Sequence, residues 1–133
     1  MVQKLAAMTL LVRDYDEAIA FYRDKVGFDL VEDTPLRDGK RWVLMAPPGS
    51  TETRLLLAKA DGEQQQTRIG DQAGGRVFLF LQTDDFARDH AVMKNAGVRF
   101  LEPPRSEAYG TVAVFEDLYG NQWDLIEPAS AKE

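Results

Sequence analysis

The chain has 133 residues, of which 44% are hydrophobic and 29% charged, which is the composition of one soluble globular domain. Its net charge of −6 and its scattered basic residues argue against a nucleic-acid partner. No apolar run approaches the roughly 20 residues that a membrane span needs, and the start carries no signal segment. Cysteine is absent, which excludes disulfides and thiolate chemistry, and we expect a cytoplasmic protein.

The first half of the chain predicts a strand, a helix and three further strands. Asp14 is the expected N-cap of the helix, with Glu17 three residues later as in a capping box. Gly27 is expected to end the helix, because glycine adopts a positive φ without strain. Asp38-Gly39 is typical of a hairpin turn. The expected strands are residues 4–12, a strand from 28, 40–45 and 53–58.

The pattern restarts after a polar stretch. Asp84 is the expected N-cap of a second helix, which has Phe86, His90 and Met93 along one side and ends at Gly97. The expected strands are residues 76–82, a strand from 98, 111–115 and 122–126. The first of these, RVFLFLQ, is apolar on both faces and predicts a central strand.

The two halves match at a displacement of 70 positions. The identical residues at this displacement are Asp14 and Asp84, Gly27 and Gly97, and Glu32 and Glu102. Two of the three pairs occupy the positions where the helices start and stop, which indicates an internal repeat. We predict an α+β fold of two tandem βαβββ modules, at about 1–60 and 75–128, joined by a linker at 61–74 and followed by a tail at 129–133. The alternative is two unrelated βα units in one domain.

Two segments resemble the signatures of a known superfamily. Asp14-Tyr15, followed by AIAFY and VGF, and the closing stretch FEDLYGNQWDLIE (115–127) are similar to those of the vicinal oxygen chelate (VOC) superfamily. This superfamily includes glyoxalase I, bleomycin-resistance proteins and extradiol dioxygenases, so the fold does not specify the activity. The resemblance implies one VOC domain over 1–133, with a curled, partly open sheet around a cleft, helices outside, and a homodimer.

The resemblance also implies where a metal would be held. Metal-using members bind a divalent ion through four His or Glu side chains on the first and last strands of each module. These positions fall on Ala7, Leu56, Phe78 and Asp124. Three of these residues cannot ligate, and Asp124 is one methylene shorter than the usual Glu. We therefore expect no cofactor, and a divalent metal is disfavoured.

Other registers do not restore the ligand set. Val77 in place of Phe78 cannot ligate, and Glu52 in place of Leu56 restores one ligand. His90, the one histidine of the chain, lies in the second helix and is interpreted as a helix residue. A metal-dependent enzyme would therefore need non-standard ligands.

Strand alternation places Gln122 and Asp124 on one face of the last strand and Trp123 on the other, beneath the second helix. Phe78 and Phe80 also share a face, which predicts an apolar, aromatic cleft with one carboxylate. Such a cleft suits a largely apolar ligand with a cationic or donor group. The candidate ligand-binding residues are Phe78, Phe80, Trp42, Arg54, Tyr109, Gln122 and Asp124. Structural roles stay open for three of them: Trp42 as a core or interface anchor, Arg54 as a solvated strand residue and Tyr109 as a loop plug.

Burial of Asp124 beside aromatic side chains would raise its pKa and make it a candidate general base. Alternatively, Asp124 hydrogen-bonds to neighbouring strands and only maintains the shape of the cleft. Two hypotheses follow. The first is a metal-free, small-molecule-binding homodimer of the bleomycin-resistance kind. The second is an enzyme, a glyoxalase-like lyase or isomerase or a dioxygenase-type protein, that uses non-standard metal ligands or Asp124 as general base.

Overall fold

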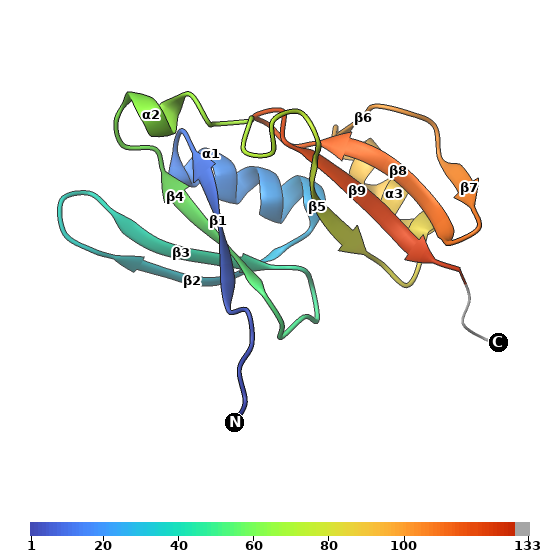
Figure 1. Cartoon of the computed structure of the whole chain (residues 1–133), viewed down its shortest axis with the longest axis horizontal. Helices are drawn as coiled ribbons and strands as arrows, with labels where there is room; N and C mark the ends of the chain where they lie inside the picture. The colour runs from blue at the N-terminus through green and yellow to red at the C-terminus, as the bar shows by residue number, and fades with distance from the viewer. Residues whose placement is uncertain (130–133) are drawn as a thin grey trace. The chain divides into compact units, whose positions relative to one another are not determined.

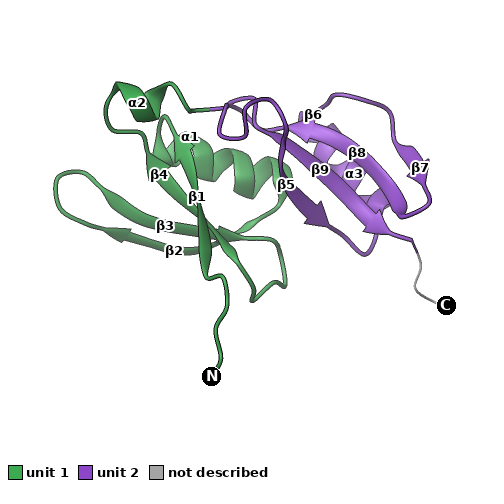
Figure 2. Ribbon diagram, viewed as in Figure 1, with its two compact units in different colours: residues 1–69 green, residues 70–133 purple. Residues whose placement is uncertain are grey.

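The computed structural model describes residues 1–129, so the predicted tail, except for its first residue, lies outside the described residues. The chain divides into two compact units, residues 1–69 and the residues from Gly70 onward (Figure 2). The boundary lies within the polar stretch at 61–74. Each unit is described by itself.

Unit 1 is a four-stranded sheet with one long helix. Its elements are β1 (Ala7–Val12), α1 (Tyr15–Ala20), the π-helical segment η1 (Phe21–Val26), β2 (Asp29–Pro35), β3 (Arg41–Ala46), β4 (Arg54–Lys59) and the short helix α2 (Glu63–Gln66). The strand order is β1-β4-β3-β2. β1 and β4 are parallel, and the other neighbours are antiparallel (Figure 1).

Unit 2 repeats this topology. Its elements are β5 (Val77–Gln82), α3 (Phe86–Asn95), β6 (Arg99–Phe100), β7 (Arg105–Glu107), β8 (Gly110–Glu116) and β9 (Gln122–Pro128). The strand order is β5-β9-β8-β6, with β7 paired to β8 as an additional short strand that the sequence did not predict. The predicted α+β class with a repeated module is confirmed. The prediction that RVFLFLQ is a central strand is wrong, because β5 is the terminal strand of the unit 2 sheet.

The helix starts agree with the sequence in one unit and differ by one residue in the other. An Asp14 carboxylate oxygen accepts a hydrogen bond from the Glu17 backbone N–H at 2.9 Å, as predicted. In unit 2 the N-cap is Asp85, not Asp84, because Asp85 Oδ1 accepts from the Arg88 N–H at 3.1 Å. The Asp84 side chain is 89% exposed and contacts the Arg88 guanidinium instead.

The π-helical segment explains why the two helices differ in length. Gly27 follows its N-cap, Asp14, by 13 positions, whereas Gly97 follows Asp85 by 12. A π-helical turn accommodates one extra residue in a helix, and η1 lies in the longer of the two. Both glycines have a positive φ, 93° and 99°, as expected at a helix end.

The core of unit 2 contains a row of rings that begins on α3. The ring centroids of Phe86 and His90 are 5.4 Å apart, and those of His90 and Phe100 are 4.3 Å apart. The row continues through Phe115 to Trp123, with separations of 5.6 and 5.9 Å. Trp123 therefore faces the helix side of its sheet, as the strand alternation predicted.

The neighbouring aspartates at the start of α3 form a matched pair for a stability test. We expect Asp85→Ala to lower the free energy of unfolding by about 1 kcal/mol, because the cap is lost. Asp84→Ala should change it by less than about 0.5 kcal/mol, since that side chain is exposed. Urea unfolding of both variants measures the difference. Equal losses, or a larger loss for Asp84→Ala, would contradict this assignment of the cap.

Candidate functional site

The candidate site lies on the face of the unit 2 sheet opposite α3. Glu127 Oε1 accepts a hydrogen bond from the backbone N–H of Phe86, the first residue of α3, at 2.7 Å, so Glu127 shares the helix side with Trp123. Because side chains alternate along a strand, Asp124 points to the opposite face. There it is paired across the sheet with Phe80 on β5 and with Val114 on β8.

Phe80 and Asp124 have unusual environments for their residue types. Phe80 is 67% exposed although it is a large apolar side chain, and Asp124 is 8% exposed although it is ionisable. Among the described residues, the buried Asp124 Oδ1 has no hydrogen-bond partner. An unpaired buried acceptor is rare and costs free energy. The exposed ring of Phe80 thus lies in register with a largely buried carboxyl group.

The environment of Asp124 shifts its carboxyl group toward the protonated form, with burial as the largest cause. Burial raises the pKa of the Asp124 carboxyl group; the charge of Arg105 opposes this effect and that of Glu102 adds to it. Arg105 is already paired, with its Nε 2.9 Å from Glu102 Oε1 and its guanidinium also bound to Glu107. The hydrogen bond from Arg105 lowers the pKa of Glu102, whose Oε2 also accepts from the Val114 N–H at 3.0 Å. Arg105 is therefore held by its two glutamates, and its charge offsets only part of the effect of burial on Asp124.

Tyr109 belongs to the same group of residues. It lies between β7 and β8, is 55% exposed, and hydrogen-bonds to the Arg105 side chain. The sequence identified Tyr109 but missed Arg105 and the role of Glu102. The spacing of Glu102 and Arg105 in the sequence does not predict that they lie near Asp124. Their position depends on the pairing of β7 with β8.

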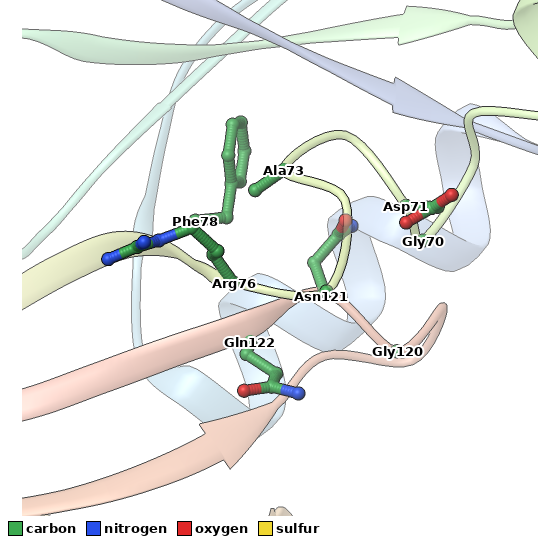
Figure 3. A pocket seen from close by; sticks show the side chains of 9 residues that line it. Gly70, Asp71, Ala73, Arg76, Phe78, Gly120, Asn121 and Gln122 are labelled. Carbon is green, nitrogen blue, oxygen red and sulfur yellow. The ribbon is translucent and has the colours of Figure 1, made fainter.

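Phe78 and Gln122 line a small cavity of about 20 Å³ (Figure 3). Its other lining residues are Gly70, Asp71, Ala73, Gly75, Arg76, Gly120 and Asn121. A Cβ on Gly70, which has φ +79°, would lie 2.0 Å from the Tyr119 carbonyl oxygen, so glycine permits this close approach. A cavity of this volume holds about one water molecule, so it is too small for an organic ligand.

The remaining candidates lie in unit 1. Trp42 is 40% exposed and lines a cavity of about 220 Å³. Arg54 begins β4, and its buried Nε has no hydrogen-bond partner among the described residues. Of the seven predicted residues, unit 2 thus holds Phe78, Phe80, Tyr109, Gln122 and Asp124.

The four positions at which relatives place metal ligands do not fit a divalent ion. Ala7 lies in β1, Leu56 is paired with Thr9, and Phe78 lies at a register shift in β5. These three side chains have no donor atoms, which leaves Asp124 as a single carboxylate. Within residues 1–129, no three His, Cys, Asp or Glu side chains group so that they could hold a metal ion.

His90 is part of the aromatic row. Burial, and secondarily the charge of Lys94, lowers its pKa, which favours the neutral form of the ring between Phe86 and Phe100. This environment agrees with the interpretation of His90 as a helix residue. The described part of the chain contains no helix with the length and apolar character that a membrane crossing requires.

With the fold and the site described, the class is established: the chain belongs to the Glyoxalase/Bleomycin resistance protein/Dioxygenase superfamily, whose family model matches residues 4–125. A protein of Shewanella frigidimarina (strain NCIMB 400), described as uncharacterized, is 56% identical over 96% of this chain and 95% of its own length.

Two solved structures from Streptomyces sp. CB03234 are also similar. TnmS3, described as an antibiotic binding protein, has a TM-score of 0.79 and 31% identity, and the match covers 96% of this chain and 98% of TnmS3. A glyoxalase/bleomycin resistance protein has a TM-score of 0.73 and 34% identity over 92% of this chain and 98% of its own.

The raised pKa of Asp124 predicts a pH-dependent effect on stability. Because the folded state binds this proton more tightly, the wild type loses stability as the pH rises from the ordinary value of 3.8 through the raised pKa. We expect Asp124→Asn to raise Tm at pH 7 by about 2–4 °C, and this gain to shrink at acidic pH. Thermal melts across the pH range measure the effect. Asp84→Asn, at an exposed position, is the control, and an equal response of both variants would contradict the prediction.

Proposed function

We propose that this protein is a small-molecule-binding protein that acts without a metal ion, as a cytoplasmic homodimer, and sequesters a largely apolar aromatic ligand with a donor or cationic group. The observation that carries the proposal is the unpaired, buried Oδ1 of Asp124 beside the exposed ring of Phe80.

The two side chains give complementary contributions to binding. A planar ligand ring gains by covering Phe80, because this removes apolar surface from water. A ligand N–H or ammonium would gain by donating to the carboxyl group of Asp124, which is 8% exposed. Tyr109 adds a third, exposed contact surface. Such a site combines a mainly apolar surface with few polar groups, as small-molecule sites usually do.

The similarity to TnmS3 supports this function, since that relative is described as an antibiotic binding protein. The residue types at the four metal-ligand positions support the metal-free part of the proposal, because Ala7, Leu56 and Phe78 cannot coordinate an ion. Metal analysis of protein purified without chelators tests that part. One tightly held ion per chain would overturn it.

The binding site is tested with two variants and a ligand panel. A thermal-shift screen of aromatic amines, their neutral analogues and antibiotics should identify ligands that raise Tm. For such a ligand, we expect Asp124→Asn to weaken binding by roughly 10- to 100-fold, the range for hydrogen bonds to charged groups. Phe80→Ala should weaken it to a similar degree, because the ring's apolar contact is lost.

Val92→Ala is the matched control, because Val92 is also an exposed apolar residue, at 60%, but lies on α3. It should leave affinity unchanged. If ligands stabilise the wild type, Phe80→Ala and Asp124→Asn equally, the proposed site is wrong. If no member of a broad panel binds, the proposed function is wrong.

A second candidate function is favoured by the raised pKa of Asp124, which moves this carboxyl group toward the range useful for a general base. In that case the protein would convert its ligand. Product analysis after prolonged incubation of wild type and Asp124→Asn with each ligand distinguishes the two functions. A product formed by the wild type and abolished in the variant would favour the enzyme.

The homodimer is supported by the terminal strand β2, in which all seven residues are exposed. An exposed strand edge is commonly covered by a partner chain. We expect light scattering at micromolar concentration to give twice the chain mass of 15.0 kDa. A monomer at that concentration would contradict the proposal.

A further inference from the structure

The Glu102 side chain completes the edge of the unit 2 sheet between two short strands. β6 and β7 both pair with β8, and their pairing leaves Val114 between them. The Leu101 N–H donates to the Val114 carbonyl oxygen at 2.8 Å, and Glu102 Oε2 accepts from the Val114 N–H at 3.0 Å. A side-chain carboxylate therefore takes the place of a backbone carbonyl group at this point of the ladder.

The same carboxylate binds Arg105. Arg105 Nε lies 2.9 Å from Glu102 Oε1, and its Nη2 lies 3.2 Å from Glu102 Oε2. Its Nη1 is bound to Glu107, and its side chain also forms a hydrogen bond with Tyr109. A two-point pair of arginine and carboxylate fixes the orientation of the guanidinium as well as its position. The guanidinium is therefore held by residues 102–109.

Arg105 and Asp124 lie on the same face of the sheet, with β8 between them. Arg105 is opposite Val112 and Asp124 is opposite Val114, and directly opposed residues point to the same face. Val112 and Val114 share that face because they are two positions apart on one strand. The charge of Arg105 acts on Asp124 across β8. In the part of the chain that the structure describes, Arg105 nevertheless forms no ion pair with Asp124.

We propose that Glu102 is a positioning residue of the Asp124 site: it binds Arg105, and the carboxyl group of Asp124 thereby stays open to a cationic ligand. Without the charge of Glu102, Arg105 competes with the ligand for Asp124. Glu102 therefore sets the charge preference of the site, and the ligand class is an aromatic ammonium rather than a neutral donor. The inference rests on the function proposed above, because it concerns the same site.

Glu102→Gln separates the charge of this residue from its structural role. The Gln carbonyl oxygen can still accept from the Val114 N–H, so the sheet edge keeps its hydrogen bond. The charge that holds Arg105 is removed. Glu116→Gln is the matched control, because it removes the same charge from the ion pair of Glu116 with Arg99 on the same sheet.

A cycle of double variants tests the inference without a ligand. In Glu102→Gln, Arg105 is released to pair with Asp124, so Asp124→Asn then removes an ion pair. We expect the change in Tm on Asp124→Asn at pH 7 to be lower by about 2–4 °C in this background than in the wild type. In the Glu116→Gln background it should equal the wild-type change. The same change in Tm in all three backgrounds would overturn the inference.

Ligand binding is tested with benzylamine, which is a cation at neutral pH, and with benzyl alcohol, its neutral analogue. In titrations of ¹⁵N-labelled full-length protein followed by nuclear magnetic resonance, the wild type and Glu116→Gln should prefer benzylamine. In Glu102→Gln this preference should fall about 3- to 10-fold, because one ion pair contributes modestly. An unchanged preference in Glu102→Gln, or an equal fall in both variants, would overturn the inference. If neither probe binds the wild type, the function proposed above is contradicted, and the cycle of double variants still decides the role of Glu102.

Discussion

In each unit the first and last strands lie side by side in parallel, β1 with β4 and β5 with β9. This pairing decides which side chains lie on each face of the two sheets. A parallel pair cannot be closed by a tight turn and needs a crossover connection. The helix between the first two strands of each unit lies in this connection and covers one face of the sheet. The apolar residues of the core therefore lie on the face that the helix covers, and the helix leaves the opposite face uncovered.

The same topology carries different side chains in the two units. In unit 1 the parallel pairing places Thr9 beside Leu56, whereas in unit 2 it places Phe80 beside Asp124. The strand order is the same in the two units, so the backbone does not require Thr9 with Leu56 in one or Phe80 with Asp124 in the other. The repeat therefore conserves a scaffold, and the two free faces differ by substitution alone. This is the general situation in which one fold supports several functions.

The sequence predicts the ends of the helices correctly, because a positive φ at a helix end strongly favours glycine. Gly27 and Gly97 end their helices because a positive φ is required there. The start of α3 was misplaced by one residue, because Asp84 and Asp85 are adjacent and either can cap a helix. The position of β5 was also mispredicted: Phe80 made the segment apolar on both faces, but this ring is exposed on a terminal strand. An apolar residue that breaks the burial rule is a pointer to function rather than to fold.

The features that sequence reasoning missed are those that depend on long-range pairing. Glu102 reaches Val114 across 12 positions, and Arg105 comes near Asp124 because β7, β8 and β9 are neighbours. The cavity at Trp42 depends on where the ladder between β3 and β4 ends, which no local pattern encodes.

The arrangement around Asp124 is not the most stable one that its neighbours allow. Arg105 influences Asp124 electrostatically, and a direct pair between them would satisfy the buried carboxylate. Glu102 and Glu107 hold the guanidinium instead, and Asp124 Oδ1 is left without a donor. An isolated polar atom of this kind lowers stability unless something else satisfies it. A ligand that donates to Asp124 and covers Phe80 would satisfy both exceptional residues at once, which is why we propose this pair as the site.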